Sequence, residues 1–174
     1  MTSGMSMSGR AAIAGVGATA QGKLPGRTAL DLGIEAFRHA LDDAGLRKED
    51  VDGLLTMPGT TSPEGSLHYL RFGEAVGINP RFTASLTMGG GTAGALVQMA
   101  ALAVASGMAS VVACVFGDTA KTGGVRFDRA SGGEVPWSHW GMMGAAANSA
   151  VAADRHMHAY GTTSLQLAEV AVAC

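Results

Sequence analysis

The sequence predicts an α/β fold in which helices pack on a parallel sheet, and three observations support this class. Segments with the pattern of strands alternate with segments with the pattern of helices along residues 10–117. The continuous apolar run of residues 110–117 is typical of a central parallel strand that is covered on both faces. Glycine supplies 26 of the 174 residues, about twice its average share, which allows backbones to approach each other closely.

Four strands and three helices are expected before residue 118. The strands are residues 10–19, 51–57, 81–88 and 110–117, and the helices are residues 28–44, 66–77 and 91–107. The first helix has the clearest signals, because Thr28 suits the N-cap position and Gly45 suits the residue after the helix end. Its apolar residues recur at helical spacing: Leu30, Ile34, Phe37 and Leu41. This alternation of strands and helices predicts right-handed crossovers.

The helix expected at residues 91–107 is almost free of polar side chains, so we expect it to be buried on all sides. The segment 119–144 has no regular pattern but contains both tryptophans, so we expect an ordered loop there. Two further helices are expected at residues 145–159 and 164–173. The sequence stops at Cys174 within the last expected helix, without a cap, which suggests a fragment or a split protein.

Composition excludes several classes of protein. Twelve basic and 14 acidic residues give a net charge of −2, which disfavours nucleic-acid binding through a basic surface. No stretch reaches the about 18 uninterrupted apolar residues of a membrane span, and the start of the chain lacks the pattern of a signal peptide. Cys114 and Cys174 do not have the spacing of a metal site, so we expect no bound metal and two buried or incidental thiols in a reducing cytoplasm.

The first glycine-rich turn, Gly15-Val16-Gly17-Ala18-Thr19-Ala20, matches a permissive form of the dinucleotide-binding fingerprint. That function requires a helix to begin at the turn, so that its N–H groups face the pyrophosphate. Here Gly22 and Pro25 intervene, and the helix pattern begins only at Thr28. An ordinary glycine-rich turn is the better interpretation, with nucleotide binding a distant alternative.

The second glycine-rich turn contains Gly89, Gly90 and Gly91, followed by Thr92 and the apolar helix. The N-terminus of a helix offers unpaired N–H groups and a partial positive charge, which suit an oxyanion or a thioester carbonyl. Tight packing of a buried helix N-terminus would explain the same residues. The turn by itself does not decide between these two interpretations.

Several short motifs occur in an order and spacing that are together fairly specific. Besides the second glycine-rich turn, they are Ala14-Gly15-Val16-Gly17-Ala18-Thr19 with Pro25-Gly26-Arg27-Thr28, Ala44-Gly45-Leu46 with Glu49-Asp50-Val51-Asp52, Met143-Gly144-Ala145-Ala146-Ala147-Asn148, and Tyr160-Gly161-Thr162-Thr163. Through these motifs nearly the whole chain resembles the N-terminal half of a thiolase-fold protein. The resemblance is to the sterol-carrier, lipid-transfer branch of the thiolase superfamily.

The resemblance implies a three-layer half of the five-layer αβαβα thiolase sandwich, followed by the start of a loop domain. Residues 1–118 would form the N-terminal thiolase-like α/β domain and residues 119–174 an incomplete loop-domain segment. The C-terminal thiolase half would be absent from this chain. The helix at residues 91–107 would then be exposed on one side, and the chain would pair with a C-terminal fragment, dimerise or aggregate. A homodimer in the cytoplasm is expected.

In thiolases a cysteine at the start of the buried helix is acylated, and the position that would carry it is Gly90. Glycine cannot act as a nucleophile, so the resemblance implies a thiolase-like protein without Cys-dependent chemistry. The substrate-binding residues would be Gly89, Gly90, Gly91 and Thr92 at the turn, with Met143 and Gly144 lining the acyl pocket. Met142 stands where many members carry a histidine. The catalytic residues are unknown, and the general acid and base are expected in the absent half.

Cysteine-free members of this branch are similar to steroid side-chain retro-aldolases, which cleave β-hydroxyacyl-CoA thioesters together with an OB-fold, zinc-ribbon partner. The resemblance therefore implies C–C bond cleavage on acyl-CoA thioesters in lipid or steroid side-chain degradation. Coenzyme A thioester would be the substrate, with no permanently bound cofactor. Two alternatives stay open: a non-catalytic acyl-CoA or lipid carrier or scaffold subunit, and a Cys-independent acyltransferase.

Among the five histidines, only His139 is selected as a candidate for substrate binding, because it lies between the two tryptophans of the long loop. His39 and His68 are expected to be solvated on helices. His156 and His158 lie two residues apart on a helix and face different directions, which argues against a shared metal.

Overall fold

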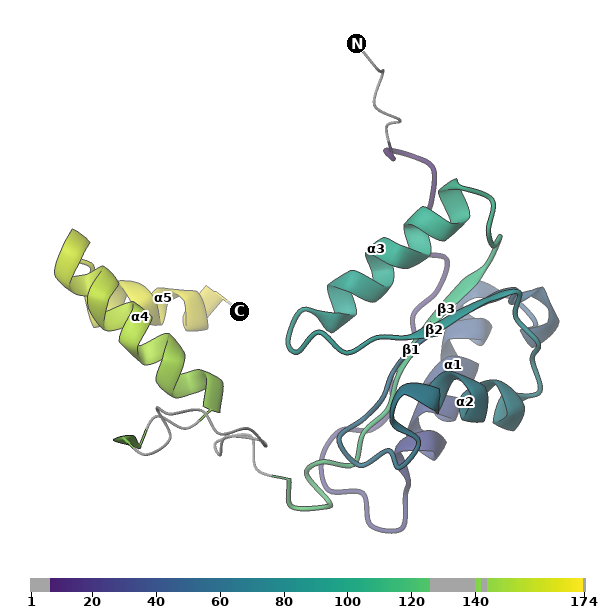
Figure 1. Ribbon diagram of the computed structural model, residues 1–174, viewed down its shortest axis with the longest axis horizontal. Coiled ribbons are helices and arrows are strands. Elements are labelled where there is room, and N and C mark those ends of the chain that lie inside the picture. The colour runs from purple at the N-terminus through teal and green to yellow at the C-terminus, as the bar shows by residue number, and fades with distance from the viewer. Residues whose placement is uncertain (1–6, 126–139, 142–143, 174) are drawn as a thin grey trace. The chain divides into compact units, whose positions relative to one another are not determined.

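The computed structural model describes residues 7–125, 140–141 and 144–173, and the chain divides into two compact units, Met1–Val125 and Arg126–Cys174. The described part of the first unit contains three parallel strands and three α-helices, so the predicted α/β class is confirmed (Figure 1). In chain order the elements are α1 (Ala29–Ala44), β1 (Gly53–Met57), α2 (His68–Val76), β2 (Phe82–Ser85), α3 (Thr92–Ala105) and β3 (Val112–Phe116). Short 3-10 turns at Lys48–Asp50 and Gly65–Leu67 precede β1 and α2.

The sheet has the order β2-β1-β3, so β1 lies in the centre of the described strands. Gly53 of β1 is paired with Phe82 of β2 and with Val112 of β3, and both pairings are parallel. Helices α1 and α2 cover one face of this sheet and α3 lies on the other (Figure 1). Because the strands are parallel, the loops after β1, β2 and β3 all leave the sheet on the same side, at the carboxyl ends of the strands.

The hydrophobic core lies between the sheet and the pair α1 and α2. Leu54 of β1 and Phe72 of α2 are fully buried, and Phe37 of α1, Val115 of β3 and Val51, which precedes β1, complete the cluster. The rings of Phe37 and Phe72 meet edge to face at 5.7 Å, an arrangement that aromatic pairs prefer. This core holds the carboxyl ends of the strands in place for the loops that follow them.

The signals that predicted the first helix are confirmed. Thr28 is the N-cap of α1: its side chain accepts a hydrogen bond from the backbone of Asp31, and the Asp31 carboxylate accepts one from the backbone of Thr28. Gly45 ends the helix with a left-handed φ of 65°. The expected strands at residues 51–57 and 81–88 and the expected helix at residues 66–77 are also confirmed, as β1, β2 and α2.

The strand expected at residues 10–19 is wrong: these residues form no ladder with any described strand. They lie instead against α1, so closely that a Cβ added to Gly17 would be 2.1 Å from the Ala36 carbonyl oxygen. The side chains of Ile13 and Val16 are 73% and 69% exposed. The apolar pattern is real, but no neighbouring strand among the described residues offers hydrogen-bond partners.

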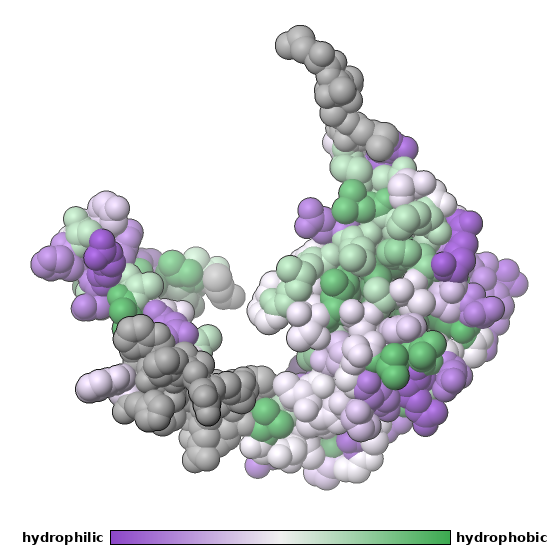
Figure 2. Space-filling view, viewed as in Figure 1, coloured by the Kyte–Doolittle hydropathy of each residue, from purple (hydrophilic) through white to green (hydrophobic). Residues whose placement is uncertain are grey.

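Two burial expectations are also wrong in the described part of the chain. Strand β3 is not central but lies at an edge of the sheet, and its Phe116 is half exposed. Helix α3 is not buried on all sides, because Val97 and Leu102 are also half exposed. Figure 2 shows mainly apolar residues over α3. The described structure therefore leaves part of the apolar surface of β3 and α3 exposed.

The described part of the second unit consists of α4 (Gly144–Tyr160) and α5 (Ser164–Ala173), which confirms the two helices expected there. Neither helix contains a buried residue. Within the described ranges, no helix has both the length and the apolar character required to cross a membrane. Most of the tryptophan-containing loop lies outside the described residues.

Candidate functional site

The glycine-rich turn between β2 and α3 reverses the chain at the carboxyl ends of the three strands. Gly89 has a left-handed φ of 58°, which side chains disfavour. The Gly91 N–H donates to the Met88 carbonyl at 3.4 Å, and the Thr92 N–H donates to the Gly89 carbonyl at 3.2 Å. A Cβ added to Gly90 would meet no atom within 4 Å. Gly90, to which the resemblance assigns the position of a thiolase nucleophile, is therefore backbone beside open space.

Thr92 closes this turn from the inside. Thr92 is only 1% exposed. Its Oγ1 accepts a hydrogen bond from the Met88 N–H at 2.8 Å, and the same hydroxyl donates to the Gly89 carbonyl at 2.7 Å. Both roles of the hydroxyl are thus used within the turn. Thr92 holds the shape of the turn, whereas the open space lies beside Gly90.

Two exposed residues in the first turn of α3, Ala93 and Gly94, have N–H groups without an acceptor among the described residues. The N–H of Ala95 is the first beyond them to be paired, with the Gly91 carbonyl at 3.1 Å. Free N–H groups at the positive end of a 14-residue helix can donate to a carbonyl or a developing oxyanion. The local geometry is therefore compatible with the thioester position inferred from the sequence.

The remaining predicted binding residues belong to the second compact unit, and most of them lie outside the described residues. His139 and Met143 lie outside the described residues. Gly144 begins α4 with a left-handed φ of 73° and belongs to the other compact unit. Among the described residues, no group of three His, Cys, Asp or Glu side chains is arranged to hold a metal ion.

Asp118, which joins the loops after β3 and β1, is not among the residues predicted from the sequence. One carboxylate oxygen accepts hydrogen bonds from the backbone and hydroxyl of Thr60, at 2.9 and 2.8 Å. The other accepts from the backbone and hydroxyl of Thr61, at 3.3 and 2.8 Å, and from the backbone of Thr119 at 2.8 Å. The sequence did contain a signal for this clamp. An acidic residue directly follows one predicted strand, and two threonines follow the neighbouring parallel strand.

The surroundings of Asp118 favour its charged form. Burial by itself would raise the pKa of Asp118, but the hydrogen bonds from Thr60, Thr61 and Thr119 outweigh burial and lower the pKa below its ordinary value. A Cβ on Gly59 would be 2.3 Å from the Gly117 carbonyl oxygen, so the two loops are in direct contact. Asp118 therefore acts as a structural clamp between the loops after β1 and β3.

The expectation that His68 is solvated is wrong. His68 is the first residue of α2, its side chain is 1% exposed, and its Nδ1 has no hydrogen-bond partner among the described residues. The nearest carboxylate oxygen, on Glu64, is 3.8 Å from Nδ1. His39 is exposed as expected, and its Nδ1 is 2.8 Å from the Ala18 carbonyl oxygen. Among the described residues, the ring contacts of these two histidines are with Ala18, Glu64 and Phe72, and none is with the glycine-rich turn.

Cys114 lies in β3, on the same sheet face as α3, and the residue is exposed rather than buried. Desolvation of the thiol by its neighbours raises the pKa of Cys114. A raised pKa reduces the thiolate fraction at neutral pH, which is opposite to the shift that an activated nucleophile needs. That Cys114 is an incidental thiol remains a prediction.

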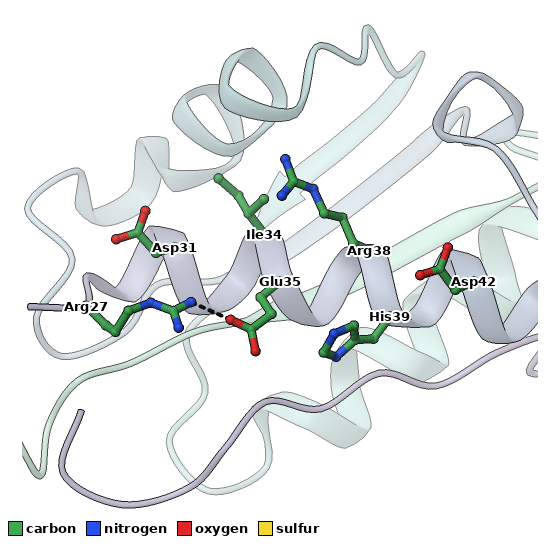
Figure 3. A pocket seen from close by; sticks show the side chains of 7 residues that line it. All are labelled: Arg27, Asp31, Ile34, Glu35, Arg38, His39 and Asp42. Atoms are coloured by element: carbon green, nitrogen blue, oxygen red, sulfur yellow. Dashed lines mark hydrogen bonds and ion pairs between the residues drawn. The ribbon is translucent and has the colours of Figure 1, made fainter. Parts of the chain in front are cut away.

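A groove of about 570 Å³ runs along the outer side of α1, on the face of the sheet opposite α3 (Figure 3). Its charged side chains include Arg27 and Glu35, which form an ion pair with each other, and Asp31, which belongs to the N-terminal cap of the helix. Exposed ion pairs of this kind contribute little free energy. The groove offers no converging set of groups for a reaction and is separate from the glycine-rich turn.

The chain is similar to known proteins in sequence and in structure. No family model matches the chain. It is 40% identical over 176 residues to a steroid side-chain-cleaving aldolase of Thermomonospora curvata, covering 94% of this chain and 44% of that protein. It is 38% identical over 179 residues to a 17-hydroxy-3-oxo-4-pregnene-20-carboxyl-CoA lyase of Mycobacterium tuberculosis, covering 96% and 45% of the two sequences.

The solved structure of an Ltp2-ChsH2(DUF35) aldolase is similar with a TM-score of 0.70 and 37% sequence identity, over 88% of this chain and 39% of that one. The chain therefore spans less than half the length of the proteins to which it is similar. Its homologues are named as aldolases or as a CoA lyase, which is the class of protein that the resemblance implied.

Proposed function

We propose that this chain forms part of an aldolase that cleaves a carbon–carbon bond in a steroid side chain carried as a coenzyme A thioester. The observation that carries the proposal is the 40% identity, over nearly the whole chain, to a steroid side-chain-cleaving aldolase. The placement within the thiolase superfamily is part of the proposal, with Gly90 at the position of the thiolase nucleophile.

The proposed reaction is a retro-aldol cleavage of a β-hydroxyacyl-CoA. A base removes the proton from the hydroxyl, the C–O bond becomes a carbonyl, and the bond between the α and β carbons breaks. Its electron pair passes to the α carbon as the enolate of the shortened thioester, which then takes up a proton. The products are a ketone and a shorter acyl-CoA. No thiol participates in these steps, which agrees with glycine at position 90.

In this reaction the start of α3 would bind the thioester carbonyl. The N–H groups of Ala93 and Gly94 would donate to the oxygen on which negative charge develops, because no described residue accepts from them. The space beside Gly90 would admit the thioester, and Gly89 and Gly91 would let the substrate approach the backbone. Met143, Gly144 and His139 are proposed to contact the acyl group.

The proposed partner is a second protein of the OB-fold, zinc-ribbon type. It is supported by the two-component description of the similar aldolase structure. A homodimer is proposed for the complete protein. Coenzyme A enters as part of the substrate, in agreement with the CoA lyase to which the chain is similar, and no permanently bound cofactor is proposed.

The test uses the full-length natural protein with its partner and a steroid β-hydroxyacyl-CoA, and products are measured by mass spectrometry. The expected result is equal amounts of ketone and shortened acyl-CoA. A graded pair at Gly90 examines the site: Gly90→Ala should retain most activity, because an added Cβ meets no atom, whereas Gly90→Leu should raise KM at least tenfold. Equal activity of Gly90→Leu and the natural protein would refute the assigned site.

A non-catalytic acyl-CoA carrier is the second candidate function. It is favoured by one observation, the absence of a side-chain nucleophile at position 90. The same assay distinguishes the two functions, because a carrier would bind the thioester without forming ketone. Binding without turnover, in the presence of the partner, would support the carrier and reject the aldolase.

A further inference from the structure

Two hydroxyl side chains meet beneath α2 at the carboxyl ends of β1 and β2. Thr56 Oγ1 lies 2.7 Å from Ser85 Oγ, and Thr56 is fully buried. Ser85 Oγ also accepts a hydrogen bond from the Tyr69 N–H at 3.2 Å. One hydroxyl therefore connects three elements: the last residue of β2, the central strand, and the first turn of α2.

Ser85 replaces the cap that α2 lacks. The N-cap position of α2 is Leu67, which cannot accept a hydrogen bond through its side chain. The first N–H groups of a helix have no partner within the helix, and here the hydroxyl from the neighbouring strand receives one of them, from Tyr69. A side-chain change at Ser85 would therefore loosen α2 and the end of β2 together.

The glycine-rich turn begins directly after this junction. The Leu86 N–H donates to the Thr56 carbonyl at 2.9 Å, which extends the pairing of β2 by one residue. From Thr92 onward the chain is fixed again, by the buried hydroxyl bonded to Met88 and Gly89. Between these ends, Gly89 and Gly90 have open space where a Cβ would stand. Packing around the glycines supplies little restraint. The conformation of the turn therefore depends on the junction before it and on Thr92 at its end.

We infer that Ser85, through Thr56 and Tyr69, is a positioning residue that fixes the entry to the glycine-rich turn and so the orientation of the N–H groups at the start of α3. Ser85 does not touch the reacting atoms. This inference rests on the proposed function for its catalytic consequence, but its structural consequence can be measured without any substrate.

The first measurement is amide hydrogen exchange in the full-length natural protein. Ser85→Ala should accelerate exchange of the hydrogen-bonded amides of Met88, Gly91 and Thr92 about tenfold, as expected for the loss of one partly buried hydrogen bond. Amides in the middle of α1 should exchange at an unchanged rate. The matched control is Thr83→Val, which removes a hydroxyl two residues earlier in β2 that makes no hydrogen bond with described residues.

Two further variants keep the inference testable if Ser85→Ala folds poorly. Thr56→Val removes the other hydroxyl with little change in shape and should accelerate the same amides. Ser85→Thr retains the hydroxyl and should restore the slow exchange. Unchanged exchange at the turn in Thr56→Val, or equal acceleration throughout α1, would overturn the inference.

The second measurement is steady-state kinetics. Ser85→Ala should lower kcat about tenfold with KM within twofold of the natural value, and Ser85→Thr should recover kcat. A rise in KM with unchanged kcat would overturn the positioning role. If the natural protein with its partner forms no product, the proposed function fails, and the exchange measurement still decides whether Ser85 positions the turn.

Discussion

The clamp at Asp118 makes a quantitative prediction about stability. Its carboxylate accepts five hydrogen bonds, two on one oxygen and three on the other, from Thr60, Thr61 and Thr119. In Asp118→Asn the amide nitrogen cannot accept, so at least two donors lose their acceptor. A hydrogen bond to a charged group contributes about 1.5–3 kcal/mol, but the clamp is partly exposed and water replaces part of the loss, so we expect a cost of about 1–2 kcal/mol.

Asp118→Ala removes all five acceptor contacts and should cost about 2–4 kcal/mol. The assay is urea denaturation of the full-length natural protein, followed by circular dichroism and analysed from the midpoint and slope. Asp42→Asn is the matched control, because Asp42 is exposed and its carboxylate has no hydrogen bond among the described residues. That control should stay within about 0.5 kcal/mol of the natural protein.

The same clamp predicts a pH dependence with a defined sign. The folded-state pKa of Asp118 is lowered, so the charged carboxylate stabilises the folded state above the unfolded-state pKa. The advantage of the natural protein over Asp118→Asn should therefore be complete above about pH 5 and decline as the pH falls through the ordinary range for aspartate and below it. An advantage that is absent at pH 7, or that grows as the pH falls, would refute this account of the clamp.

Three further outcomes are expected. Gly17→Ala should destabilise the fold by about 3 kcal/mol or more, since the added Cβ would overlap the Ala36 carbonyl. Gly94→Ala should be neutral or stabilising by up to about 1 kcal/mol, because a Cβ there meets no other atom. Thermal melts of the two variants measure the difference. Thr28→Ala should cost about 1 kcal/mol in urea denaturation through the loss of the α1 cap, and an unchanged midpoint would contradict that role. Iodoacetamide should modify Cys114 more slowly than a free cysteine peptide at pH 7 and faster as the pH rises, because its pKa is raised; peptide mapping measures the rate, and loss of activity on modification would contradict a non-catalytic thiol.

Local signals predicted the helices and most strands well. The cap at Thr28 and the left-handed Gly45 determine the ends of α1 through contacts within a few residues of the chain. Local sequence patterns similarly located β1, α2 and β2. Such signals act over short sequence distances, so a single sequence is sufficient to detect them.

Signals that depend on distant partners were less informative. Residues 10–19 have the apolar pattern of a strand, yet a strand requires a neighbour, and the described residues provide none. His68 has the sequence context of a solvated residue, but the packing of α2 on the sheet buries it. Asp118 became significant only because the loop after β1 brings two threonines to it across the sheet edge.

The sequence by itself determined the α/β class, the glycine-rich turn before α3 and the glycine at position 90, because composition, periodicity and residue identity are local properties. Only the tertiary structure decided that Thr92 is used within the turn, that Ser85 connects two strands to α2, and that α3 leaves Val97 and Leu102 half exposed. These facts depend on which atoms meet across the parallel sheet, and that proximity is created by folding and is not encoded in any single segment.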